Sequence, residues 1–136
     1  MLIRNATPTD IKAVAVMSIS RGNKEFPESV DHVYAAEHDG AVLGVGGIKL
    51  MTPTVAWCWM DWSEGVRGHM IPIYRMVWDW LDTLVKLHGL KRLMAAVECD
   101  FPEAIRTVEH LGFHQESIML NWNGDKSAYL YVRLEN

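Results

Sequence analysis

Residues 95 to 113 read AAVECDFPEAIRTVEHLGF and decide the fold of this chain. The apolar run at 93–97 is typical of a buried strand, and a helix is expected to follow it directly. Asp100 has the side chain of an N-cap residue, and Pro102 has a fixed φ angle that suits a first helical turn. Gly112 can adopt the left-handed conformation that ends a helix. The stretch therefore predicts a strand, a capped helix and a glycine stop in immediate succession.

The rest of the chain continues this alternation of strands and helices. Thr7 is expected to cap a helix that begins at Pro8. Asp39 and Gly40 predict a tight hairpin turn, because both residue types tolerate positive φ angles. The remaining expected elements are a short strand at 2–3, a helix at 8–20, strands at 33–38, 41–50 and 54–62, a long helix that ends at Gly89, and closing strands at 113–122 and 127–134.

Strand 54–62 is expected to lie in the centre of the sheet, because both of its faces are largely apolar. Gly44, Gly46 and Gly47 in the strand before it indicate either a bulge or the close approach of another backbone or side chain. The tryptophans of this region are interpreted mainly as core residues, with Trp62 or Trp78 exposed; they are Trp57, Trp59, Trp62, Trp78 and Trp80.

The composition predicts a single globular domain over residues 1–136, because 49% of the 136 residues are hydrophobic and can build a core without crosslinks. The net charge of −4, with no basic stripe, disfavours nucleic acid as a partner. Cys58 and Cys99 are not part of a recognisable disulfide or metal-binding motif, which is typical of a protein in a reducing compartment. The first residues have the pattern of neither a signal peptide nor a membrane anchor. We therefore expect a cytoplasmic protein that binds no membrane.

The stretch that decides the fold resembles the acyl-CoA-facing half of the GNAT superfamily of N-acetyltransferases. The similarity rests on Asp100, on Ala104 in the helix, and on the closing Leu111, Gly112 and Phe113. The order of strands and helices is also that of the family, so the resemblance covers most of the chain. It implies a mixed α+β domain with the GNAT-like acyl-CoA N-acyltransferase fold, in which a mostly antiparallel sheet of about seven strands is flanked by helices.

The resemblance implies acetyl-CoA as the cofactor. In the family, the turn before the long helix wraps the pyrophosphate, where a helix N-terminus offers N–H groups and a positive dipole end. Here Met70 and Pro72 stand where the family has small residues, and Pro72 removes one N–H group. Arg67 and a protonated His69 can compensate by charge. The implied cofactor contacts are Met60, Trp62, Arg67, Gly68, His69, Met70, Ile71, Asp100 and Phe101.

The resemblance also implies direct attack of an amine on the thioester. In the family, a backbone N–H group at the end of the central strand, here at 60–62, polarises the thioester carbonyl. A tyrosine of the family often gives a proton to the departing thiolate, and Val108 stands in its place here. Asp61 and Glu98 are the candidate bases for the amine, each weighed against a purely structural role.

The acceptor that the resemblance implies is an amine of a small molecule or of a protein. Region 22–32 shapes the acceptor pocket in the family, which makes Glu25, Phe26 and Glu28 candidates for contacting it. Cys99 is a candidate acyl-carrying nucleophile, although a small buried residue is the plainer interpretation. The six histidines show no metal-ligand spacing, so we expect no metal site.

A second hypothesis is that the chain has lost catalysis and binds a protein partner. The substitutions Met70, Pro72, Phe101 and Val108 fall at cofactor and acid positions, and the pattern is similar to short, divergent GNAT-like proteins of bacteriophages. The protein would then be a virion component or a host-protein binder. The N-acetyltransferase is the favoured hypothesis, and a homodimer is compatible with either.

Overall fold

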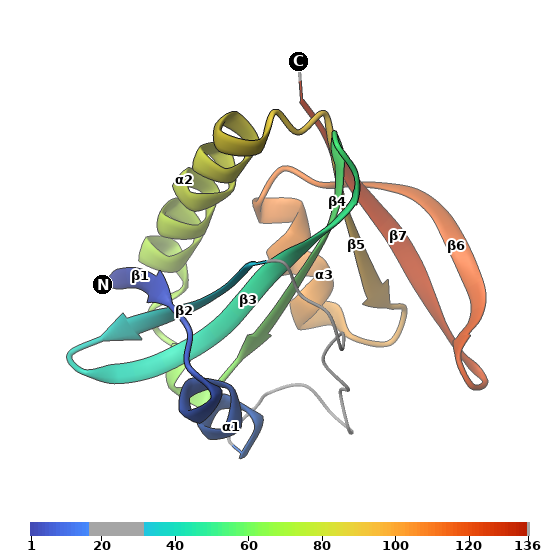
Figure 1. The fold of residues 1–136 in the computed structure, drawn as a ribbon. Helices are drawn as coiled ribbons and strands as arrows, with labels where there is room; N and C mark the ends of the chain where they lie inside the picture. The colour runs from blue at the N-terminus through green and yellow to red at the C-terminus, as the bar shows by residue number, and fades with distance from the viewer. Residues whose placement is uncertain (17–31, 136) are drawn as a thin grey trace. The chain divides into compact units, whose positions relative to one another are not determined.

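The computed structural model describes residues 1–16 and 32–135, which form a mixed α+β fold (Figure 1). Strands and helices follow one another in the predicted order. The elements are β1 (Leu2–Asn5), α1 (Pro8–Val16), β2 (His32–His38), β3 (Ala41–Thr52), β4 (Val55–Trp62), the short 3₁₀ helix η1 (Glu64–Val66), α2 (Met70–His88), β5 (Arg92–Glu98), α3 (Pro102–His110), β6 (His114–Asn123) and β7 (Lys126–Leu134).

The strands form one seven-stranded sheet in the order β1-β2-β3-β4-β5-β7-β6. β4 is the fourth strand in this order, which confirms the prediction that strand 54–62 is central. β1 with β2, β2 with β3, β5 with β7, and β6 with β7 pair antiparallel, whereas β4 and β5 pair parallel. The mostly antiparallel sheet with helices agrees with the predicted fold class.

Two compact units can be distinguished along the chain. The first contains Met1–Lys49 and Cys58–Trp80, and the second contains Leu50–Trp57 and Leu81–Asn136. Each unit is described by itself below. The expectation of one domain over 1–136 concerns independent folding and stays a prediction.

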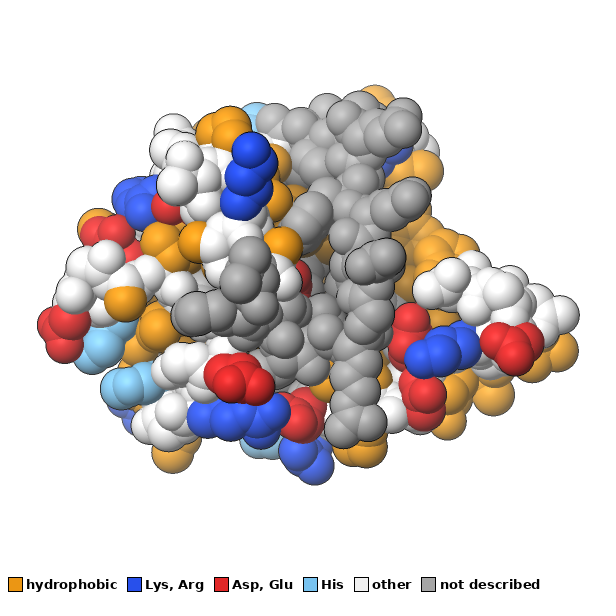
Figure 2. Space-filling model, turned by 90° about the horizontal axis from the view of Figure 1, so that it is seen from below, with side chains coloured by type: hydrophobic (Ala, Val, Ile, Leu, Met, Phe, Trp, Pro, Cys, Tyr) orange, Lys and Arg blue, Asp and Glu red, His pale blue; other side chains and the backbone are white. Residues whose placement is uncertain are grey.

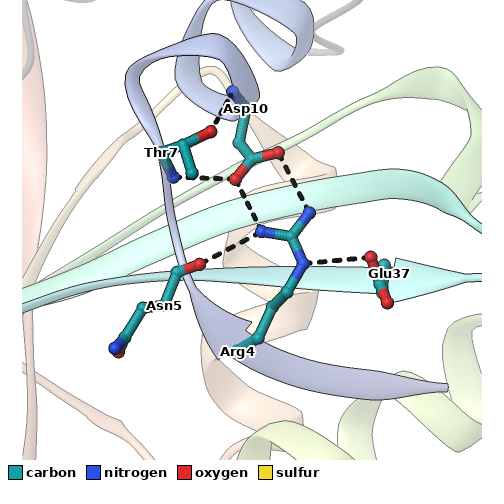
Figure 3. A network of polar contacts seen from close by, with 5 residues as sticks. All are labelled: Arg4, Asn5, Thr7, Asp10 and Glu37. Atoms are coloured by element: carbon teal, nitrogen blue, oxygen red, sulfur yellow. Dashed lines mark hydrogen bonds and ion pairs between the residues drawn. The ribbon is translucent and has the colours of Figure 1, made fainter.

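The start of α1 in the first unit is a reciprocal cap. The backbone N–H of Asp10 donates to Thr7 Oγ1 over 3.3 Å, and the N–H of Thr7 donates to Asp10 Oδ2 over 2.7 Å (Figure 3). Arg4 donates to both oxygens of Asp10 and, from Nε, to Glu37 on β2. The predicted cap at Thr7 is therefore confirmed. The end of this helix at residue 20, and the proposed contacts Glu25, Phe26 and Glu28, lie outside the described residues.

Replacing Asp10 with Asn is expected to destabilise the protein at neutral pH. Hydrogen bonds from Arg4 hold the pKa of Asp10 well below its ordinary value of 3.8. The ionised carboxylate therefore stabilises the folded protein at pH values above 3.8, and this stabilisation is lost as the pH falls towards the pKa of the folded state. Urea unfolding should therefore show a lower midpoint for Asp10→Asn at neutral pH and a smaller difference in acid. An equal difference at both pH values would contradict this account. Asp39→Asn, at an exposed hairpin position, is the control.

The hairpin that joins β2 and β3 has the turn that the sequence predicts. Asp39 and Gly40 have φ angles of 51° and 79°, as a tight turn of this type requires. Ala35 on β2 and Val45 on β3 pack with Val14 of α1 into a buried cluster. Gly44 and Gly46 of β3 lie against residues of the candidate active site described below.

The long helix α2 buries the residues that its periodicity predicts, with one exception. Ile73, Val77, Leu81 and Leu84 are buried, which confirms the helical spacing of the apolar residues. Leu87 is 71% exposed, because the last turn extends past the buried stripe. Gly89 has a φ angle of 65° and ends the helix as predicted.

The helix α3 begins one residue later than the sequence suggests. Phe101, not Asp100, is the N-cap residue, and Pro102 occupies the first helical turn. The carboxylate of Asp100 instead lies 3.7 Å from Lys126 Nζ, so the predicted cap is wrong. The helix end is as predicted, since Gly112 has a φ angle of 87° and the N–H of Phe113 donates to Val108 O over 3.0 Å.

Candidate active site

The end of β4 in the first unit carries the residues proposed to hold the thioester. Trp62 is 9% exposed and Trp78 is 38% exposed, so the expectation that one of these two tryptophans is exposed is confirmed by Trp78. The Trp62 ring lies over β3: a Cβ atom added to Gly44 would stand 2.2 Å from Cε3 of the ring. A Cβ atom on Gly46 would stand 2.9 Å from Trp59 O. The predicted close approach at these two glycines is therefore confirmed.

The backbone of β4 presents two N–H groups on the edge that faces away from β3. The N–H of Ser63 donates to Leu43 O over 2.8 Å, which fixes the direction of that peptide group towards β3. Because successive N–H groups of a strand alternate in direction, those of Trp62 and Met60 point to the opposite edge. The pairs of β4 with β5, in the described part of the chain, run from Val55–Arg92 to Trp57–Met94. This ladder does not occupy the two N–H groups.

The segment after β4 forms a turn that leads into the N-terminus of α2. Val66 and Arg67 donate backbone hydrogen bonds to Ser63 O and Glu64 O over 3.1 Å each, and these bonds shape η1. Gly68 has a φ angle of 89°, which a side chain would strain. The N–H of Ile73 donates to His69 O over 3.2 Å, so His69 directly precedes the helix.

The positive end of α2 is close to two imidazoles. Helix geometry leaves the N–H groups of Met70 and Ile71 without an intrahelical acceptor, and Pro72 has no N–H group. The rings of His69 and His38 lie 5.0 Å apart between centroids. His38, at the end of β2, was not anticipated from the sequence, because only the sheet brings it beside the turn. The helix dipole and the Arg67 guanidinium together favour an anion.

A small apolar hollow of the first unit lies between α2 and the sheet and is lined in part by the same Met60 and Trp62. Its lining includes Tyr34, Gly44, Trp62 and Trp80, and its volume is about 280 Å³ with the open mouth included. Tyr34 and Trp80 meet edge to face, with 5.2 Å between ring centroids. The lining has no charged side chain, so the hollow does not suit the phosphates of a cofactor.

The two candidate bases have different surroundings. Asp61 lies on β4 in the first unit and is only 4% exposed. Glu98 lies at the end of β5 in the second unit, is half-buried, and has an oxygen 3.7 Å from Lys126 Nζ. Asp100 contacts the same Lys126. Glu98 can thus be reached by a small molecule from solvent, whereas Asp61 is enclosed.

Other candidate residues have mainly structural surroundings. Cys58 is buried and Cys99 half-buried, and neither of these two residues forms a disulfide. Val108 is half-buried on α3 and Phe101 half-buried before it. The described residues contain no group of three metal-ligating side chains. None of the described helices has the length and apolarity to cross a membrane.

Solved structures with this fold are N-acetyltransferases. A spermidine N-acetyltransferase mutant from Vibrio cholerae matches with a TM-score of 0.80 and 12% identity, over 98% of this chain and 95% of that one. Ard1 from Thermoplasma volcanium matches with a TM-score of 0.76 and 22% identity, over 98% and 96%. The ribosomal-protein-S18-alanine N-acetyltransferase from Escherichia coli matches with a TM-score of 0.75 and 14% identity, over 96% and 91%.

These similarities show that the chain has the GNAT fold. No protein-family model and no curated protein sequence matches it.

Proposed function

We propose that this chain, which has the GNAT fold, is an enzyme that transfers an acetyl group from acetyl-CoA to an amine. The proposal rests on one observation: the end of β4 is followed by a turn that leads into the N-terminus of α2, which is the positive end of the helix dipole. Backbone N–H groups of Met60 and Trp62 are directed away from β3, and the turn with Arg67 and His69 leads directly into the helix. These are the donors that a thioester carbonyl and a pyrophosphate require.

In this proposal the chain holds the cofactor through the segment 60–71. The turn and the first N–H groups of α2 bind the pyrophosphate, with Arg67 adding charge and His69 adding a ring N–H donor. The N–H groups of Met60 and Trp62 stabilise the oxyanion that forms at the thioester carbonyl. Asp100 and Phe101 belong to the second unit, and their contact with the cofactor stays a prediction from the family resemblance.

The transfer itself needs no nucleophilic side chain. The acceptor ammonium loses a proton to a carboxylate or water, and its nitrogen then forms a bond to the carbonyl carbon. The bond from that carbon to sulfur breaks, the nitrogen loses a second proton to solvent to give the neutral amide, and the thiolate of coenzyme A leaves and takes up a proton from solvent. Val108 cannot supply this proton, and Cys99 is not required as an acyl carrier.

Calorimetric titration with acetyl-CoA tests the cofactor site. We expect a dissociation constant in the micromolar range, about −8 kcal/mol. Arg67→Ala should weaken binding about tenfold or more, because it removes a charged donor to the phosphates. Arg75→Ala, an exposed cation further along α2, is the matched control and should bind as the unsubstituted protein does. Equal effects of the two substitutions would show that Arg67 does not contact the cofactor.

A further inference from the structure

One face of the sheet in the second unit is covered by α2 and α3. Arg133 on β7 forms an ion pair with Asp82 of α2. Tyr131 lies two residues away on the same face, and its pKa is raised by burial and by the nearby charge of Glu109 on α3. Side chains of a strand alternate between faces, so Val132, which lies between these two, and Leu130 point to the other side of the sheet.

The opposite face of the sheet in this unit carries apolar side chains that are partly exposed to solvent. Met94 pairs with Trp57 on β4, and Ala96 pairs with Leu130 on β7, so these four side chains share that face. Ala96 is exposed, and the other three are half-buried. Figure 2 shows hydrophobic side chains gathered over the β6–β7 hairpin at the right of the view. We call the four residues with Trp122 the aromatic face.

Trp122 is brought onto this face by an irregularity of β6. Pairing with β7 shifts between Met119 and Asn123, and Asn121 has a φ angle of 53°, which is rare for a residue other than glycine. The Trp122 ring lies 6.1 Å from that of Trp57 with an angle of 37° between planes, yet Trp122 remains 51% exposed. A bulge of this kind re-aims a side chain, here towards an aromatic partner.

The charges beside the aromatic face favour a cation. Glu98 lies two residues after Ala96 on β5, on the same face, and shares Lys126 with Asp100 at 3.7 Å from each. Two carboxylates against one ammonium leave a net negative charge. Arg92, at the other end of β5, is already bonded to Glu116 over 2.8 Å. An ammonium group is therefore attracted to the Glu98 end.

We propose that the aromatic face binds the acceptor amine, and that this acceptor is a primary amine with an aromatic or apolar carbon skeleton. The skeleton packs on Trp57 and Trp122, and the ammonium lies towards Glu98, where a tryptophan ring face also attracts a cation. The statement that the bound amine is the acceptor rests on the proposed function. Binding of the amine itself does not require acetyl-CoA.

The test is direct binding of two probe amines, 2-phenylethylamine and ethanolamine, to the protein without cofactor, followed by NMR of the tryptophan indole N–H signals. We expect 2-phenylethylamine to shift the signals of Trp57 and Trp122 and to bind at least tenfold more tightly than ethanolamine. Trp122→Ala should weaken its binding about tenfold. Trp78→Ala, which removes an exposed tryptophan of α2, should leave the binding unchanged.

Equal binding of the two amines, or shifts confined to other tryptophans, would overturn the proposal. The same holds if both substitutions weaken binding equally. Trp122→Leu, which keeps an apolar side chain at the bulge, is used if the alanine variant does not fold. Failure of acetyl-CoA to bind in the separate calorimetric titration would remove the proposed function but leave the amine site to be judged by this experiment alone.

Discussion

Glu98→Gln is expected to lower kcat by about 10²–10⁴-fold, the range that removal of a general base produces. The carboxylate of Glu98 is half-buried at the end of β5, and the aromatic face proposed for the acceptor ends beside it. An amine held there can give its proton to Glu98 before it attacks the thioester. Glutamine keeps the size of the side chain but cannot accept that proton as a base.

Two control substitutions separate this role from the ion pair. Asp100→Asn removes the other carboxylate that contacts Lys126; because Asp100 is also an implied cofactor contact, this variant should change KM for acetyl-CoA and leave kcat almost unchanged. Asp61→Asn is expected to reduce stability more than kcat, because Asp61 is only 4% exposed and enclosed in the first unit. A large loss of kcat in Asp61→Asn, with Glu98→Gln active, would transfer the role of base to Asp61. Steady-state kinetics and thermal unfolding of the three variants decide between these outcomes.

Gly44→Ala is expected to have the second large effect. The added Cβ atom would stand 2.2 Å from the Trp62 ring, so the ring or the strand must move. Overpacking of this kind costs about 1–3 kcal/mol of folding stability. Movement of Trp62 would also displace the N–H group proposed to bind the thioester carbonyl, so kcat should fall together with stability.

Gly65→Ala is the matched control for this prediction. A Cβ atom there would stand 3.4 Å from Leu43 Cδ2, which is an ordinary contact. We expect urea unfolding to show little change for Gly65→Ala and a clear loss for Gly44→Ala. An unchanged unfolding midpoint in Gly44→Ala would show that Trp62 is not held against β3.

Local sequence signals were sufficient for most of the fold. The cap at Thr7, the turn at Asp39 and Gly40, and the helix ends at Gly89 and Gly112 each depend on residues close in sequence, and the structure confirms all of them. The order of elements followed from the spacing of apolar residues. The order of the strands across the sheet was not predicted beyond the central place of strand 54–62, since spacing alone does not say which strands are neighbours.

The errors arise where distant residues compete with local preference. Asp100 has the ideal side chain for an N-cap, but Lys126 from the β6–β7 hairpin contacts it instead. The sequence left open which of Trp62 and Trp78 is exposed, and the missing side chain of Gly44 gives the Trp62 ring a buried place. Neither partner can be identified from sequence spacing. The same is true of His38 beside His69 and of Trp122 beside Trp57.

Mass spectrometry of the reaction with acetyl-CoA and a panel of primary amines, together with an assay of released thiol, tests the central claim most directly. The account predicts an acetylated amine and free coenzyme A in equal amounts, formed fastest with aromatic amines and greatly slowed by Glu98→Gln. If acetyl-CoA stays intact with every amine while the protein is folded, acetyl transfer is contradicted, and the hypothesis of a partner-binding protein with the GNAT fold takes its place.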